Sequence, residues 1–106
     1  SGKVKHVGLS EFSPEWTRKC HAIHPVAAIQ IEWSLLTRKP VEEILLSCCK
    51  ELKIPIVAYS PLARNILAGV SDVPTDFRMN VPRHHGENLK RNLELVQQIE
   101  ELAQKR

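Results

Sequence analysis

Val26-Ala27-Ala28-Ile29-Gln30-Ile31-Glu32 is the stretch of sequence on which the fold prediction depends. The run is almost wholly apolar before it ends in a polar residue, which is typical of a strand buried on both faces of a parallel sheet. One similar run precedes it, another follows it, and a helix-like segment comes after each of the three. Strands that alternate with helices build a parallel sheet, so the sequence predicts an α/β fold with strands at Val4–Leu9, Val26–Ile31 and Ile54–Ala58.

Helix signals separate the predicted strands. Ser13 and Pro14 are typical of a helix N-terminus, and Pro25 ends that helix. Pro40 begins a second helix. The apolar residues of these two helices predict one buried stripe on each: Trp16, Cys20 and Ile23 on the first, and Val41, Ile44, Leu45, Cys48 and Leu52 on the second.

The region after the third strand has a different character. Residues 60–87 contain several prolines and glycines and show no periodicity, so we expect a long loop with one short turn or strand near Ile66-Leu67. A strong helical pattern begins at Asn88 and continues to the end of the sequence.

Composition excludes several classes of function. The 106 residues are 42% hydrophobic and 25% charged, as in an ordinary globular protein of one domain or less. The net charge of +3 is small and its basic residues are scattered, so we expect no nucleic-acid partner. No apolar run is long enough to span a membrane and no leader opens the sequence, so we expect no membrane partner. The odd number of cysteines, three, favours free thiols and a cytoplasmic location.

Motifs for metals and nucleotides are not found in the sequence. The four glycines cannot form a dinucleotide-binding fingerprint or a phosphate-binding P-loop. His21 and His24 have no partner ligands at a recognised spacing, so we expect no metal site. His84-His85 is expected to be exposed to solvent, and Cys48-Cys49 to be packed in a helix as unreactive thiols.

A sheet of three strands is incomplete as a fold. With helices on one side only, its two edges and one apolar face remain open. Ile29, Ile31, Ile56 and Ala58 are the residues that we expect to need a cover. The remainder of a larger sheet or barrel, or another chain, is therefore the expected partner.

Polar residues follow each apolar strand, at the end where parallel sheets carry their chemistry: Ser10, Gln30, Tyr59 and Ser60. Such residues also begin ordinary turns. Gln30 is more informative because it interrupts an apolar strand, where a buried amide must find a partner. The residues alone leave the functional and the structural interpretation open.

The sequence resembles the aldo-keto reductases, in particular the branch of auxin-induced-like and perakine-reductase-like enzymes. The resemblance rests on residues 2–11, 24–38 and 56–64, and on 82–83 followed by 87–92, in the family's order and spacing. It implies that residues 1–106 are part of a (β/α)8 TIM barrel, an incomplete barrel of three βα units that correspond to strands five to seven. It also implies that residues 60–87 form a loop on the cofactor side of the barrel.

The same resemblance implies a cofactor, NADP(H), and a small-molecule carbonyl substrate in the complete barrel. Ser10 and Gln30 match positions that hydrogen-bond the nicotinamide carboxamide, and Tyr59 matches the aromatic residue that stacks on the nicotinamide ring. Ser60, Leu62 and Arg64 match the loop that holds the pyrophosphate.

The sequence departs from the family pattern at several positions. Glu11 stands where many members have asparagine, and Ala63 and Asn65 stand where many have glycine. The family's proton-donating residues come from strands one to four, so no catalytic residue is assigned here and we expect the isolated chain to be inactive. A non-catalytic interaction subunit or a truncated product of the same fold is the alternative, and a flavodoxin-like domain is a weaker one.

Overall fold

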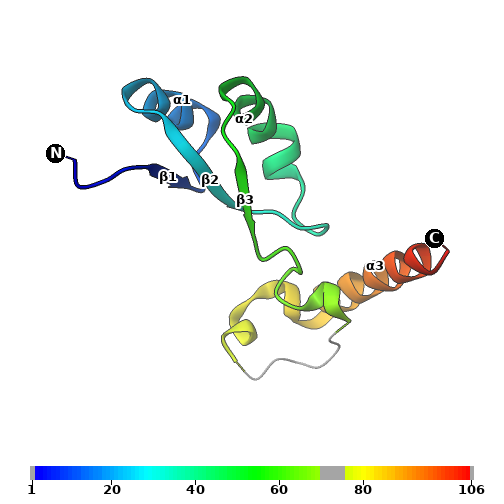
Figure 1. Ribbon diagram of the computed structural model, residues 1–106. Helices are drawn as coiled ribbons and strands as arrows, with labels where there is room; N and C mark the ends of the chain where they lie inside the picture. Colours follow the sequence, from blue (N-terminus) through cyan, green and yellow to red (C-terminus); the bar gives the residue numbers. More distant parts are fainter. Residues whose placement is uncertain (1, 70–75, 106) are drawn as a thin grey trace. The chain divides into compact units, whose positions relative to one another are not determined.

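The computed structural model describes residues 2–69 and 76–105 (Figure 1). The chain divides into two compact units, Ser1–Pro61 and Leu62–Arg106. The elements of the first unit, in order, are β1 (Val7–Ser10), α1 (Pro14–Ile23), β2 (Val26–Glu32), η1 (Pro40–Leu45), α2 (Leu46–Leu52) and β3 (Ile56–Tyr59).

The three strands form one parallel sheet in the order β1-β2-β3, which confirms the predicted α/β class. Strand β1 starts three residues later than predicted, and its pairing with β2 is irregular between Val7 and Gly8. Val4 is 68% exposed, so the apolar residues that precede β1 contribute little to the core.

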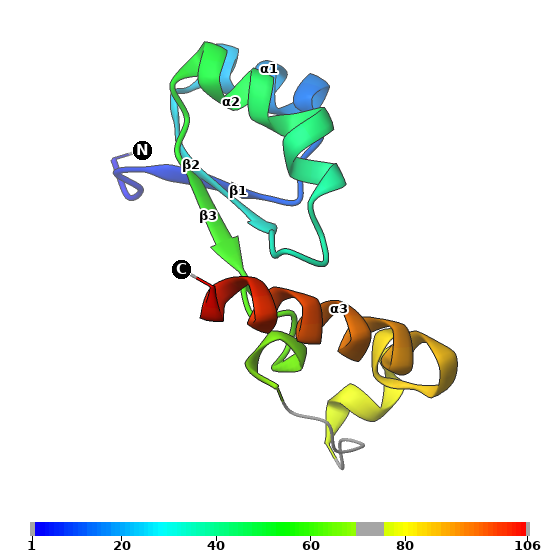
Figure 2. The same ribbon diagram turned by 90° about the vertical axis from the view of Figure 1, so that its right-hand side faces the viewer.

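Helices α1 and α2 both lie on one face of the sheet (Figures 1 and 2). The predicted start of α1 is confirmed, because the Ser13 hydroxyl accepts a hydrogen bond from Trp16 N–H and Pro14 occupies the first turn. The predicted apolar stripe of this helix is wrong. Trp16 is 57% exposed and Ile23 is 87% exposed, whereas Thr17 is fully buried, because the helix packs through the side that carries Thr17.

The second helix begins with a π-helical segment, η1, and continues as α2. Val41, Leu45 and Cys48 are buried as predicted, but Ile44 is 52% exposed. Because a π-helical turn takes more residues than an α-helical one, three residues complete less of a turn, and Ile44 does not come round to the buried side of Val41. Cys49 is buried on the inner side instead.

Strand β2 presents its two faces to different surroundings. Ile29 and Ile31 are buried in the core beneath the helices, whereas Gln30 is exposed on the other face. The expectation that β2 is buried on both faces is therefore wrong. Ile29 and Ile31 were also expected to lie uncovered on the open face, and this is wrong because the helices cover them. Val57, which is 46% exposed, lies on the open face instead.

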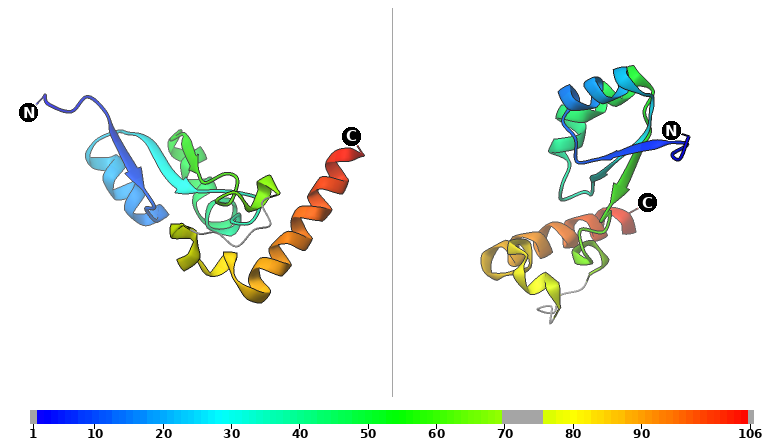
Figure 3. Two further views of the ribbon diagram at one scale, coloured as in Figure 1. Left: turned by 90° about the horizontal axis from the view of Figure 1, so that it is seen from below. Right: turned by 90° about the vertical axis from the view of Figure 1, so that its left-hand side faces the viewer.

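The second unit contains η2 (Ile66–Ala68), η3 (Phe77–Asn80), η4 (Pro82–His84) and α3 (Gly86–Gln104), shown from green to red in Figure 3. Helix η2 confirms the turn predicted near Ile66-Leu67. The predicted loop over residues 60–87 thus holds three short 3₁₀ helices, while its residues 70–75 lie outside the described residues. Helix α3 starts two residues earlier than predicted, and its side chains hold η4, because Asn92 Nδ2 donates to Arg83 O at 3.0 Å.

Candidate functional site

Ser10, Gln30 and Val57 lie side by side on three neighbouring strands. Ser10 is the register partner of Gln30 in the β1–β2 pair, and Gln30 is the partner of Val57 in the β2–β3 pair. Register partners share one face of a parallel sheet, and the alternation with buried Ile29 and Ile31 places this face opposite the helices. A shallow hollow of about 340 Å³ lies here, lined by Gly8, Leu9, Ser10, Ala28, Gln30 and Val57.

Tyr59 ends β3 on the same face as Gln30. Its register partner is Glu32, two residues beyond Gln30, and side chains two positions apart on a strand project to the same side. Tyr59 is partly buried, and its carbonyl accepts a hydrogen bond from Trp33 N–H at 3.3 Å. The structure therefore brings Ser10, Gln30 and Tyr59 together at the carboxyl end of the sheet, on the face opposite α1 and α2.

Glu11 also lies at the carboxyl end of the sheet, and no role was predicted for it from the sequence. Its N–H donates to Gln30 O at 2.9 Å, and its carboxylate Oε1 accepts a hydrogen bond from Glu32 N–H at 2.9 Å. Its backbone is left-handed, with φ of 58°. A polar residue directly after a strand was the only sequence signal for this role.

The turn after β2 is held by charged and polar side chains. Trp33 Nε1 donates to Glu42 Oε1 at 3.3 Å, and the Arg38 guanidinium donates to both oxygens of the same carboxylate. Arg38 is therefore the main reason that the pKa of Glu42 is lowered. Thr37 Oγ1 donates to Glu32 Oε1 at 3.1 Å, which joins the turn to the end of β2.

Ser60 directly follows β3 and is partly buried, with a left-handed φ of 49°. In the second unit, Ala63, Arg64 and Asn65 are left-handed in succession, with φ of 49°, 56° and 76°. Ala63 is fully buried, and the Arg64 guanidinium lies 5.7 Å from the centre of the Phe77 ring. The side chain of Leu62, the remaining predicted site residue, is 53% exposed.

The second unit also buries a histidine that was expected to be exposed. His84 is only 4% exposed, because η4 packs against α3 and turns this side chain inward. Burial, followed by the positive charge of Arg78, lowers the pKa of His84, so its imidazole is neutral near pH 7. The exposure predicted for His84 is therefore wrong, and the reason is its packing within the second unit.

Two further findings on the described residues concern metal ions and membranes. Within residues 2–69 and 76–105, no group of three histidine, cysteine or acidic side chains is arranged to hold a metal ion. His21 instead accepts a hydrogen bond from Val26 N–H through Nδ1 at 3.1 Å. None of the helices in this part of the chain combines the length and the apolar character needed to cross a membrane.

Comparison with known proteins gives one family. The sequence model of the Aldo/keto reductase family matches residues 1–106. A protein described as "Probable aldo-keto reductase 1" from Glycine max is 50% identical over 108 residues, which cover 98% of this chain and 31% of that protein. The structure of the glycerol dehydrogenase AKR11B4 from Gluconobacter oxydans matches with a TM-score of 0.85 at 30% identity, over 98% of this chain and 33% of that one. The chain thus spans about a third of the length of these relatives.

Proposed function

The chain belongs to the aldo/keto reductase family, and from this premise we propose that it forms the nicotinamide and pyrophosphate side of an NADP(H) site in a carbonyl-reducing enzyme. Its parallel strands match part of the barrel of a solved dehydrogenase. In such barrels, the carboxyl ends of the strands carry the chemistry.

The placement of Ser10, Gln30 and Tyr59 is the observation that supports this proposal most strongly. Ser10 and Gln30 are register partners, and Tyr59 lies on the next strand and the same face. A serine hydroxyl and a side-chain amide can together donate to and accept from a carboxamide, which has one carbonyl oxygen and one NH₂ group. An aromatic ring beside them offers a flat apolar surface for a planar heterocycle.

The segment from Ser60 to Arg64 is the proposed contact for the pyrophosphate. None of the residues from Ser60 to Asn65 is a glycine, yet Ser60, Ala63, Arg64 and Asn65 are left-handed. Such conformations cost about 1–2 kcal/mol per residue and are often retained at ligand-binding loops. Arg64 would supply charge-assisted hydrogen bonds, and Leu62 would act through its backbone N–H.

The bound cofactor would supply the hydride, and the residues of this chain would bind and orient it. Ser10 and Gln30 fix which face of the nicotinamide meets the substrate, and Tyr59 excludes water from the opposite face. We place the proton donor in barrel strands other than these three. The 106-residue chain alone should therefore not turn over NADPH with an aldehyde, and steady-state activity that disappears in Gln30→Ala would contradict this.

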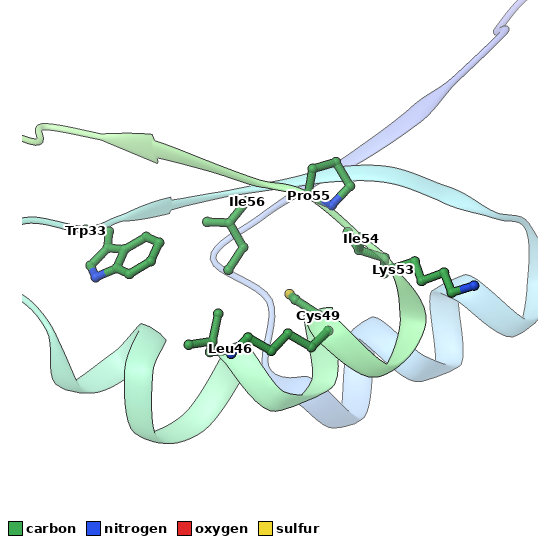
Figure 4. A pocket seen from close by; sticks show the side chains of 8 residues that line it. Trp33, Leu46, Cys49, Lys53, Ile54, Pro55 and Ile56 are labelled. Carbon is green, nitrogen blue, oxygen red and sulfur yellow. The ribbon is translucent and has the colours of Figure 1, made fainter.

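Two open apolar grooves in the first unit favour the remainder of a barrel as the partner. Next to β3, a groove of about 460 Å³ is lined by apolar side chains, including Trp33, Leu46 and Ile56 (Figure 4). At the connection from β1 to α1 and on α1 itself, residues that include Phe12 and Trp16 line another of about 620 Å³. Unpaired strand edges flanked by apolar surface favour further pairing. We propose that neighbouring βα units occupy both.

The cysteines agree with a reducing compartment, and we propose the cytoplasm as the location. All three are free thiols, and Cys48 and Cys49 are buried. Burial raises the pKa of Cys49, which keeps its thiol protonated and unreactive.

Cofactor binding to a complete barrel tests the proposal. The Glycine max relative would carry residues 1–106 in place of its matching segment, a protein called the grafted enzyme below. Fluorescence titration with NADPH should show saturable binding. Gln30→Ala should raise the Kd about tenfold, because it removes hydrogen bonds of about 0.5–1.5 kcal/mol each.

Two controls separate recognition from damage to the fold. Tyr59→Phe keeps the flat ring and should bind NADPH like the parent, whereas Tyr59→Ala should not. Ser47→Ala, at an exposed position of α2, is the control for Gln30→Ala and should bind NADPH like the parent. If the grafted enzyme folds but does not bind NADPH, or if Gln30→Ala and Ser47→Ala behave alike, the proposal is wrong.

A further inference from the structure

Glu11 takes the place of a backbone group in the sheet. Ser10 is paired with Gln30, so Glu11 stands opposite Ile31. In a parallel ladder, a residue opposite Ile31 donates its N–H to the carbonyl of residue 30 and accepts the N–H of residue 32 with its own carbonyl. Glu11 makes the first bond in the ordinary way, at 2.9 Å to Gln30 O.

The second bond is made by the side chain. At φ of 58° the backbone of Glu11 turns away from the sheet, and its carboxylate Oε1 accepts the Glu32 N–H at 2.9 Å. The side chain thus replaces the ladder carbonyl at the point where the strand ends. This allows the chain to leave the sheet directly after Ser10 while the Glu32 N–H keeps its partner.

The two bonds hold the backbone of β2 on both sides of Ile31. One bond fixes the carbonyl of Gln30, and the other fixes the N–H two residues later. One step further along the sheet, Trp33 N–H donates to Tyr59 O at 3.3 Å, so the end of β2 is also tied to β3. The relative positions of Gln30 and Tyr59 therefore depend on a strand end that Glu11 holds.

We propose that Glu11 is a positioning residue, which sets the Gln30 amide relative to Ser10 by holding the end of β2 through its carboxylate. This inference rests on the proposed function, because the amide is held for the nicotinamide carboxamide. Glu11 acts through the backbone of β2 and need not touch the cofactor. Its charge is not required, since a neutral side-chain carbonyl of the same length can accept the same hydrogen bond.

Three variants of the grafted enzyme separate the possible roles of Glu11. Glu11→Gln keeps an acceptor oxygen at the same reach. Glu11→Ala removes the acceptor and keeps the left-handed strain of a residue with a Cβ atom. Glu11→Gly removes both the acceptor and the strain, so it shows whether a defect comes from the backbone conformation or from the lost hydrogen bond.

Hydrogen exchange read by mass spectrometry tests the hydrogen bond without cofactor. The peptide that contains Glu32 should lose one protected amide in Glu11→Ala and Glu11→Gly and keep it in Glu11→Gln. Equal exchange in the parent and the three variants would overturn the proposal, because the carboxylate would then not hold the Glu32 amide. If Glu11→Gln also loses the protection of this amide, the charge is essential and the proposal is overturned as well.

Kinetics with NADPH test the consequence for function. In Glu11→Ala and Glu11→Gly the Kd for NADPH should rise, by no more than the about tenfold expected for Gln30→Ala because Glu11 acts through the Gln30 amide, with the KM for the carbonyl substrate unchanged. Glu11→Gln should restore the parent value. If the amide is lost but NADPH binding is not affected, Glu11 is structural only and the proposal is wrong. If no form binds NADPH, the proposed function is wrong, and the exchange data alone decide whether the carboxylate holds β2.

Discussion

Replacing Lys53 with glycine should stabilise the protein, because Lys53 has a backbone conformation that side chains disfavour. Helix α2 ends in a Schellman motif, in which Ile54 N–H donates to Cys49 O at 2.9 Å and Lys53 N–H to Lys50 O at 3.3 Å. Lys53 itself has φ of 56° and ψ of 36°, the left-handed position that glycine usually occupies.

The size of the effect follows from two opposing contributions. A left-handed residue with a Cβ atom costs about 1–2 kcal/mol, which glycine avoids. Glycine in turn makes the unfolded chain more flexible, which destabilises the fold by about 0.4–1 kcal/mol. The expected net gain in free energy of unfolding is therefore about 0.5–1 kcal/mol. In the grafted enzyme this corresponds to a rise in Tm of about 1–3 °C, measured by circular dichroism or calorimetry.

Two matched variants make the prediction strict. Lys53→Ala removes the same charge and side chain but keeps Cβ, so its Tm should stay close to that of the parent. Lys50→Gly places glycine inside α2 and should lower the free energy of unfolding by about 1 kcal/mol. If Lys53→Gly is no more stable than Lys53→Ala, the left-handed backbone is not the source of strain and the reasoning is refuted.

Three further predictions follow from burial and charge. Ile29→Ala empties a fully buried position and should lower the free energy of unfolding by about 2–5 kcal/mol, whereas Ile23→Ala, at 87% exposure, should change it by less than about 0.5 kcal/mol; denaturant titration compares them. Arg78 lowers the pKa of Asp76, so the ion pair stabilises η3 at pH values above the ordinary pKa of a carboxyl. This stabilisation is lost as the pH falls through the lowered pKa. Carbon NMR should show the Asp76 carboxyl titrating at a higher pH in Arg78→Gln. Burial lowers the pKa of His84 from 6.5, so below pH 6.5 the unfolded chain binds a proton that the folded chain does not. The free energy of unfolding should therefore decrease as the pH falls from 6.5 to the lowered pKa. Thermal melts should show a smaller decrease over this range in His84→Phe.

The strands and helices of the first unit could be predicted because their signals are local. Ser13 and Pro14 define the start of α1, and the apolar run from Val26 defines β2. The faces could not be predicted in the same way. Residues 26–29 contain no alternation of apolar and polar side chains, so only the tertiary structure decides that Ile29 meets the helices and that Gln30 does not.

The candidate site was predictable to a similar extent. Polar residues after apolar strands mark the carboxyl edge of a parallel sheet, and Ser10 and Gln30 do meet there. The position of Glu11 was not predictable, because its role depends on a left-handed backbone and on the register of two strands. The burial of His84 depends on the packing of η4 against α3, for which adjacent histidines give no signal.

A crystal structure of the grafted enzyme with NADP⁺ bound would test the central claim most directly. We predict the carboxamide within hydrogen-bonding distance of the Ser10 hydroxyl and the Gln30 amide, with the Tyr59 ring stacked against the nicotinamide. A nicotinamide bound away from the carboxyl end of the sheet and its face opposite α1 and α2, or one that meets neither Gln30 nor Tyr59, would contradict the account.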